Sequence, residues 1–513
     1  MCDQLRADYL SCYGHPRLHT PNIDRLAARG TRFEHAYVQA PVCGPSRMSF
    51  YTGRYAFSHG ATSNRFPLPI GERTLGDYLR PHGVRTALVG KTHMEPDQEG
   101  MKRLGLSPEE GDGLLVSECG FEPFDRDDGL HPDRRGDLDF AYNRYLRERG
   151  YGGCNPWHEY ANSALGLRGE ILSGWNMRHA RLPARVKQEH SETAYCTERA
   201  IEFIRAQGDG PWCLHLSYIK PHWPYIAPAP YHAMYGASEV LPACRSEEER
   251  RNPHPVYAAF MQHREGLAFS RDEVRNAVIP AYMGLIKQID DRLGQLFKCL
   301  DELDRWRDTL IVFTSDHGDF LGDHWLGEKE LFYEQAARVP LIVYDPHQHA
   351  PRGAVSEELV EAIDLVPTFL EALGIVLPTH FLEGRSLLPV VRRAAPLGRD
   401  AVFSELDYAV YGARGTLWVP VDRARAVMVR TRRWKMVHYD GFAAQQFDLE
   451  ADPGELRDVG RDPGHAAVRS ELKERIFDWM RSRKNRVAIA DGVVDRQGAR
   501  RKEGSGVPIG RWE

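Results

Sequence analysis

The sequence predicts an α/β protein with a mostly parallel sheet sandwiched by helices, followed by a smaller antiparallel sheet with a closing helix. Three observations predict this fold: continuous apolar runs, helix-periodic stretches between them, and a change to short successive strands after about residue 399. Strands that alternate with helices are typical of parallel sheets covered on both faces. The 513 residues also exceed what one hydrophobic core usually serves, so we expect two domains, 1–399 and 400–513.

The strands of the large sheet are expected where apolar residues run continuously between turn residues. A strand that is covered on both faces shows no polar alternation, which distinguishes it from a half-exposed strand. Runs of this kind lie at residues 86–90, 212–219, 309–314 and 340–344.

Helix-periodic stretches lie between these runs, at residues 21–29, 192–207, 271–303 and 357–373. Pro21 suits the first turn of the first helix, and Ser270 followed by Glu273 forms a capping box at the start of the third. This alternation supports the predicted sheet up to about residue 399.

The C-terminal part has a different pattern, with short strands in succession. We expect strands at 426–431, 434–439 and 445–449, and a helix at 467–481. The Gly- and Arg-rich stretch 491–513 is interpreted as a loose tail or as an arm on a neighbouring subunit, which would make the protein a homo-oligomer. The irregular segment 96–185 is expected to carry substrate contacts, because long loops over a sheet edge often do.

The composition excludes several classes of protein. A formal net charge of -5 offers no basic excess for nucleic acid, and no apolar run is long enough to span a membrane. Nine scattered cysteines do not form a disulfide framework, and the N-terminus lacks the pattern of a secretory signal. We therefore expect a cytoplasmic protein that acts on a small molecule.

The stretch from Cys43 to Arg54 carries the strongest functional signal. It reads Cys43-Gly44-Pro45-Ser46-Arg47, followed by Thr52-Gly53-Arg54. A lone buried cysteine is usually a small core residue, but this stretch resembles the modification signature of type I sulfatases in the alkaline-phosphatase-like superfamily. The resemblance implies that superfamily's fold. It also implies that a formylglycine-generating enzyme oxidises Cys43 to formylglycine, whose hydrate attacks with one hydroxyl and expels the product with the other.

Four polar residues are candidates for a metal site at the ends of strands. Asp316 and His317 directly follow an apolar run, whereas Asp3 and Gln4 follow residues that read as the end of a strand whose beginning is missing before Met1. Sites in α/β folds lie at the carboxyl ends of strands, although Asp316 and His317 also suit a simple turn. The resemblance implies that these four residues and the oxygen derived from Cys43 hold a divalent cation. The mixed oxygen and imidazole donors favour Mn²⁺ over Ca²⁺.

Several basic residues match the family's substrate contacts. By resemblance, Lys91 and His93 hold the formylglycine hydrate, and His93 accepts a proton from it. His222 and Lys329 contact the sulfate and the leaving oxygen, and Asn64 is a neutral donor. Converging cations are what a tetrahedral oxyanion requires. The predicted catalytic set is Cys43, Arg47, Lys91, His93, His222 and Lys329.

The branch of the family depends on two conflicting features. Asp3-Gln4, the Cys43-Gly44-Pro45 core and Ala227-Pro228-Ala229-Pro230 resemble phosphonate monoester hydrolases and their cytosolic arylsulfatase relatives. Lys91 and His93, by contrast, are similar to the sulfatase pair that this branch of phosphonate hydrolases tends to lack. We therefore favour hydrolysis of a sulfate ester by an arylsulfatase-like enzyme.

Three alternatives stay open at this point. The first is a phosphonate monoester hydrolase of the same family. The second is a metal-dependent phosphodiesterase that uses unmodified Cys43 or a metal hydroxide. The third is a silent metal-binding member without activity, which would follow if Asp3 and Gln4 lay on a frayed terminus.

Overall fold

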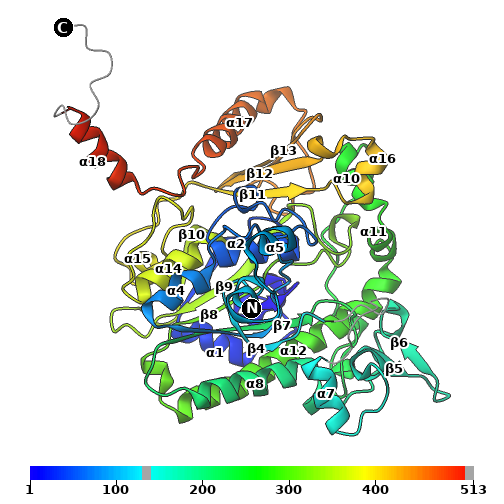
Figure 1. The fold of residues 1–513 in the computed structure, drawn as a ribbon. Helices are drawn as coiled ribbons and strands as arrows, with labels where there is room; N and C mark the ends of the chain where they lie inside the picture. Colours follow the sequence, from blue (N-terminus) through cyan, green and yellow to red (C-terminus); the bar gives the residue numbers. More distant parts are fainter. Residues whose placement is uncertain (130–139, 503–513) are drawn as a thin grey trace, which may run out of the picture.

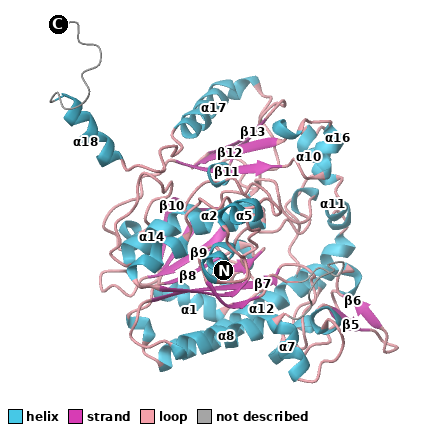
Figure 2. Cartoon of the chain, viewed as in Figure 1, coloured by secondary structure: helices cyan, strands magenta, loops and turns pink. Residues whose placement is uncertain are grey.

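The computed structural model describes residues 1–129 and 140–502 (Figure 1). It is an α/β fold with a mostly parallel central sheet and a small antiparallel sheet near the C-terminus, as the sequence predicts. Figure 2 shows the two sheets as separate groups of strands, with helices around the larger one.

The central sheet consists of two four-stranded parts. In the first, β1 (Cys2–Asp3), β7 (Trp212–Pro221), β3 (Arg85–Gly90) and β4 (Glu122–Arg126) lie in this order and are all parallel. In the second, the order is β10 (Ala354–Glu361), β2 (Thr31–Tyr37), β9 (Arg338–Tyr344) and β8 (Ile311–Thr314), with β9 antiparallel to both neighbours. A parallel bridge between Cys2 and Ser315 joins the two parts.

Each face of this sheet has its own hydrophobic core. Successive residues of a strand point to opposite faces, so Val89 packs with helices α1 (Pro21–Arg29), α8 (Glu192–Ala206) and α12 (Asp272–Glu302). Its neighbour Leu88 packs on the other side with α2 (Cys43–Thr52), α4 (Leu75–Leu79) and α14 (Leu365–Ala372). The sheet is therefore sandwiched by helices, and in Figure 1 α8 and α12 run along one side of it while α2 and α14 lie on the other.

Most predicted elements of this domain form, but one is wrong in part. The four predicted apolar runs lie in β3, β7, β8 and β9, and three predicted helices are α1, α8 and α12. The stretch 357–373 was expected to be helical throughout, whereas it contains the end of β10 and only then α14. Residues 354–358 alternate between buried and exposed, and their pairing with β2 outweighs the helical period of the apolar residues that follow.

The C-terminal sheet is antiparallel in the order β11 (Ala401–Asp407), β12 (Arg425–Thr431), β13 (Trp434–Tyr439) and β14 (Gln445–Asp448). Strand β11 was not among the predicted strands. Helix α17 (Ala466–Arg481) covers the sheet with Leu472, Ile476 and Trp479. Helix α18 (Asp491–Lys502) extends away from the body in Figure 1, and the rest of the predicted tail lies outside the described residues.

The segment 96–185 is more regular than expected, since it contains β4 and short helices such as α5 (Gln98–Leu104), α6 (Gly111–Ser117) and α7 (Ala141–Glu148). Residues 130–139 of it lie outside the described residues. None of the helices in the described ranges combines the length and apolar character that a membrane crossing requires.

Candidate active site

Cys43 is the first residue of helix α2, and all ten residues of this helix are buried. Val42 precedes it in extended conformation, and Gly53 ends the helix at a φ of 69°. The N-terminus of a helix carries partial positive charge and unpaired N–H groups, both of which favour an anion. Residue 43 therefore lies where a negatively charged group is stabilised.

Three predicted metal ligands surround the Cys43 position. Asp3, at the end of β1, and Asp316 and His317, just after β8, are all fully buried. Ligand atoms of these three residues and of Cys43 lie within 4.8 Å of one another. Cys43 Sγ is 3.0 Å from His317 Nε2, which in turn is 3.7 Å from Asp3 Oδ1 and 3.8 Å from Asp316 Oδ1.

The orientation of His317 is fixed by the backbone. Its Nδ1 lies 2.8 Å from the carbonyl oxygen of Gly318, so Nδ1 carries a proton and Nε2 points toward Cys43 and the carboxylates. Such a hydrogen bond to the second ring nitrogen is the usual support of a metal-binding histidine. Burial lowers the pKa of His317, yet the negative charges of Asp316 and Cys43 raise it to about 9.

Gln4 is held in the same cluster by the predicted Lys329 and by two residues that the sequence did not single out, Asp319 and Tyr225. Its Nε2 donates to Asp319 Oδ2 at 2.6 Å and to the Tyr225 hydroxyl at 3.2 Å, and its Oε1 accepts from Lys329 Nζ at 3.2 Å. The residue is fully buried and has a positive φ of 65°. Asp319 thus orients the amide so that its oxygen faces the basic side of the site.

Arg47 donates hydrogen bonds to the carboxylates of both Asp3 and Asp316. Its Nε donates to Asp316 Oδ2 at 2.7 Å and its Nη2 to Asp3 Oδ2 at 3.2 Å, and the side chain is fully buried. Its Nη1 donates to Ser217 Oγ at 2.7 Å and to the Lys91 carbonyl oxygen at 2.8 Å. With these contacts Arg47 is a structural clamp on the two aspartates, and its planar fork suits that geometry.

Three further cations or proton carriers converge on residue 43. Lys91 Nζ donates to Asp3 Oδ2 at 2.5 Å, and Lys329 Nζ lies 3.4 Å from His222 Nε2. His222 Nδ1 lies 2.7 Å from the Trp223 carbonyl oxygen, so its Nε2 also faces the site. Burial raises the pKa of the Cys43 thiol, but the charges of Lys329, His317 and Lys91 outweigh this and hold the pKa well below its ordinary value.

Asn64 contacts the start of α2, whereas the His93 side chain has no hydrogen bond to the residues around Cys43 in the described part of the chain. The His93 backbone N–H donates to Asp128 Oδ1 at 3.1 Å, and its ring Nδ1 is buried without a hydrogen-bond partner in the described part of the chain. The Asn64 Oδ1 atom accepts from the Gly44 N–H at 2.8 Å, so it caps the start of α2 beside residue 43. Asp128 is a third residue that the sequence did not single out, because no motif marks it.

Comparisons with known proteins give the family of this chain. A family model described as Sulfatase matches residues 1–375. The chain belongs to the sulfatase family. A second family model, the C-terminal region of N-sulphoglucosamine sulphohydrolase, matches residues 322–482 of this sulfatase-family chain.

Relatives of this sulfatase-family chain match it almost from end to end. It is 31% identical over 525 residues to the multifunctional alkaline phosphatase superfamily protein PehA of Trinickia caryophylli, covering 94% of this chain and 95% of that protein. It is 27% identical over 499 residues to an arylsulfatase of Clostridium perfringens, covering 94% and 92%. The phosphonate monoester hydrolase SpPMH from Silicibacter pomeroyi has a similar structure, with a TM-score of 0.83, 27% identity and 95% and 96% coverage. The protein is therefore a hydrolase whose relatives act on sulfate and phosphonate esters.

Proposed function

We propose that this hydrolase cleaves sulfate esters with a formylglycine made from Cys43, as an arylsulfatase-like enzyme. The observation that carries the proposal is the position of residue 43. It starts a buried helix, lies 3.0 Å from His317 Nε2, and is surrounded by Lys91, Lys329 and His222. A nucleophile that attacks an anionic ester needs this excess of positive charge around it.

The residues present fit a divalent cation. Asp3 and Asp316 supply carboxylates, His317 presents Nε2, Gln4 supplies an amide oxygen and residue 43 completes the set. These mixed donors suit Mn²⁺ better than Ca²⁺. When bound, the cation would lower the pKa of the attacking hydroxyl and polarise the ester oxygen.

The side chains around residue 43 have separate roles in this proposal. Arg47 keeps Asp3 and Asp316 in position, and Lys91 neutralises Asp3. Lys329 Nζ and His222 Nε2 lie 3.4 Å apart, so His222 can accept a hydrogen bond from the Lys329 ammonium while Lys329 donates to the departing alcohol oxygen. Asn64 and the start of α2 bind the anionic oxygens. Formylglycine supplies a nucleophile that is regenerated without attack of water on the sulfate. His93 is the proton acceptor at residue 43.

A phosphonate monoester is the second candidate substrate. The 31% identity with PehA, the likeness to SpPMH and the Asp3-Gln4 pair favour it. Lys91 favours the sulfate instead, because its ammonium lies within the site, where it donates a hydrogen bond to Asp3. Sulfate and phosphonate share tetrahedral geometry and in-line displacement, so we expect activity on both, with sulfate preferred. Phosphodiesters form a third class to compare.

The experiment that tests the proposal is a substrate panel on protein co-expressed with a formylglycine-generating enzyme. We expect kcat/KM to be highest for an aryl sulfate, lower for an aryl phosphonate monoester and lowest for a phosphodiester. A higher value for the phosphonate would make the protein a phosphonate monoester hydrolase. Absence of all three activities in metal-loaded, modified protein would favour the silent metal-binding alternative.

Cell location and assembly belong to the same proposal. We infer a cytoplasmic enzyme, since the nine cysteines in the described residues are all unpaired and reduced cysteines are typical of the cytoplasm. Helix α18 projects from the body and is suited to contact a second subunit, which supports a homo-oligomer.

A further inference from the structure

Lys329 stands in a loop whose backbone is held in an unfavourable conformation. The residues on either side of it, Glu328 and Glu330, have positive φ values of 62° and 89°. Residues that carry a side chain rarely adopt this region, and those that do persist only where the surrounding structure holds them. Lys329 itself is buried, with its Nζ 3.2 Å from Gln4 Oε1 and 3.4 Å from His222 Nε2. Its place in the site therefore depends on the contacts that hold the loop.

Backbone hydrogen bonds tie this loop to the residues around the site. The Glu328 carbonyl oxygen accepts from the Phe320 N–H at 2.7 Å, and the Glu330 N–H donates to the Pro41 carbonyl oxygen at 3.1 Å. Pro41 stands two residues before Cys43, so the second of these bonds links the loop to the start of α2. The end of the loop is held from a different part of the chain.

Lys435 of the C-terminal sheet holds the end of the loop. It lies in β13, and its Nζ donates to the Phe332 carbonyl oxygen at 3.0 Å. The same ammonium is 2.7 Å from Glu334 Oε1 and 2.7 Å from Glu455 Oε1. Glu455 Oε2 in turn accepts from the Glu334 N–H at 2.8 Å. One ammonium therefore joins the C-terminal sheet to the backbone three residues after Lys329.

The charges of this contact are shielded from water. The side chains of Lys435 and Glu455 are both 1% exposed. Arg338 Nε lies 3.3 Å from Glu334 Oε2, whereas Lys435 is the only cation at ion-pair distance from Glu455 in the part of the chain that the structure describes. Taking such charges out of water has a desolvation cost that their mutual attraction often no more than offsets. The pair is thus better explained by the geometry that it fixes than by a gain in stability.

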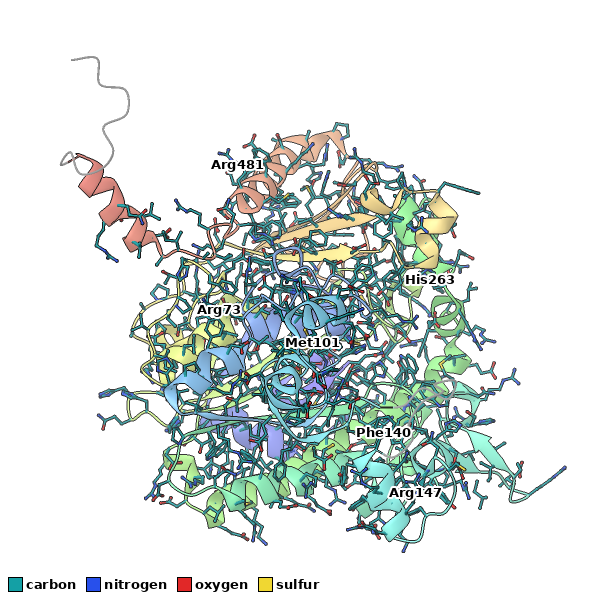
Figure 3. All side chains as sticks on the ribbon, viewed as in Figure 1. Arg73, Met101, Phe140, Arg147, His263 and Arg481 are labelled. Atoms are coloured by element: carbon teal, nitrogen blue, oxygen red, sulfur yellow. The ribbon has the colours of Figure 1, made fainter. Side chains whose placement is uncertain are left out.

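The C-terminal sheet also packs against Tyr333, the next residue of the chain. The Tyr333 ring lies 5.6 Å from that of Phe447 in β14, and its hydroxyl accepts from Gln445 Nε2 at 3.5 Å. Elsewhere His263, labelled in Figure 3, accepts from the N–H of Ala413, which lies between β11 and β12, at 3.1 Å. The end of the loop is therefore enclosed by the C-terminal part of the chain and not touched at one point only.

We propose that Lys435 is a positioning residue, which holds the loop at Phe332 and thereby keeps the Lys329 ammonium directed at the departing oxygen. The inference rests on the proposed function and gives the C-terminal sheet a part in it. Lys435 is buried and acts through the loop, without contact to substrate or metal. Its loss should weaken the assistance that Lys329 gives to the leaving oxygen, and a poor leaving group needs this assistance most.

The dependence on the leaving group tests this role in the modified enzyme. Lys435→Met keeps an unbranched side chain but removes the ammonium. Its kcat/KM is compared with that of the wild type on 4-nitrophenyl sulfate and on phenyl sulfate, whose phenolate leaves less readily. We expect a loss of about tenfold on the first ester and about a hundredfold on the second. Equal losses on both esters would overturn the proposal, because a smaller folded fraction lowers both rates alike.

Two further variants separate positioning from stability. Lys435→Met combined with Glu455→Gln removes the uncompensated carboxylate but still lacks the donor to Phe332, so we expect it to keep the difference between the two losses. It decides the question if Lys435→Met alone does not fold, and a wild-type ratio of the two rates in it would overturn the proposal. Arg399→Met is the matched control, because Arg399 is likewise buried and lies 2.5 Å from Asp364 Oδ2. It should lower stability and leave the ratio unchanged.

Binding of inorganic sulfate tests the same link without catalysis. Calorimetric titrations are run on the wild type, Lys435→Met, Lys329→Ala and the variant that combines both substitutions. We expect Lys435→Met to weaken sulfate binding by about fivefold when Lys329 is present and to have no effect when it is absent. Equal weakening in both backgrounds would overturn the proposal, since Lys435 would then not act through Lys329.

The outcomes separate this inference from the proposed function. If the wild type hydrolyses aryl phosphonate monoesters faster than aryl sulfates, the sulfatase proposal is refuted, and the same two leaving groups on phosphonates decide the role of Lys435. If it hydrolyses neither class, the sulfatase proposal is refuted again, and the sulfate titrations decide whether Lys435 positions Lys329 in an anion site. If it hydrolyses sulfates while Lys435→Met responds like Arg399→Met, the sulfatase proposal stands and the positioning role is refuted.

Discussion

Lys91 Nζ donates a hydrogen bond to Asp3 Oδ2 at 2.5 Å, which ties the end of β3 to the end of β1 inside the protein. The same oxygen accepts from Arg47 Nη2 at 3.2 Å. One carboxylate oxygen is thus shared by two buried cations, while the other, Oδ1, lies 3.7 Å from His317 Nε2. The charge of the Asp3 carboxylate is therefore balanced at Oδ2 by Lys91 and Arg47, and Oδ1 stays available to a metal ion.

Arg47→Lys should be strongly damaging although the charge is kept. A lysine cannot reproduce the contacts of Nε, Nη1 and Nη2, so Asp316 and Asp3 would lose their shared clamp. We expect a loss of about 10²–10³ in kcat/KM and about 3–5 kcal/mol in the free energy of unfolding. Steady-state kinetics and urea unfolding measure both, with exposed Arg65→Lys as the matched control. Wild-type kinetics in Arg47→Lys would show that the clamp is not needed.

Removal of the metal should abolish activity and lower the thermal midpoint, because an ion that binds only the folded site stabilises the folded chain. Elemental analysis of protein purified without added metal should find a stoichiometric manganese signal. Asp316→Asn should lose this metal as well as activity. A stoichiometric calcium signal would refute the preference for Mn²⁺, and full activity after chelation would refute the metal site itself.

Gln4→Glu should impair the enzyme through its contact with Asp319. The amide Nε2 donates to Asp319 Oδ2 at 2.6 Å, and a glutamate in its place would set two carboxylates against each other. We expect a loss of about tenfold or more in kcat/KM, since one carboxylate must capture a proton. The double variant Gln4→Glu with Asp319→Asn restores a donor and should recover most of the loss. No recovery in a double-mutant cycle would show that the contact is not the cause.

Stability should fall with pH between about 6.5 and 4 because of buried neutral histidines. Burial lowers the pKa of His59 to about 3 and that of His254 to about 4. Since the unfolded chain has the higher pKa, it binds more protons in this window, and the stability present above pH 6.5 is lost as pH falls. Each histidine contributes on the order of 2 kcal/mol between pH 6.5 and 5. Urea unfolding at several pH values should show a smaller pH slope for His254→Gln, and an unchanged slope would refute this origin.

Several residues of the candidate site could be selected from the sequence because they stand in short contiguous motifs. Cys43 stands in the sulfatase-like signature, whereas Lys91 and the pair Asp316-His317 each follow an apolar run. The structure brings these motifs together at the same edge, since parallel strands deliver their carboxyl ends there.

The features that were missed have no local signal. Asp319 orients Gln4 across 315 positions of sequence, and the Asp128 carboxylate holds His93 by accepting from its backbone N–H. Strand β10 was hidden because Leu359 and the apolar residues after it also fit a helical period, and only pairing with β2 decides between the two. Such partnerships depend on tertiary packing, which a single sequence does not display.

The central claim is that residue 43 is the source of the nucleophile as formylglycine. Mass spectrometry of the peptide that carries residue 43 measures this directly in active protein. We expect that peptide to be lighter than its cysteine form by roughly 18 Da, and the modified fraction to scale with sulfatase activity across preparations with and without a formylglycine-generating enzyme. Full sulfatase activity in protein that carries only unmodified Cys43 would contradict the account.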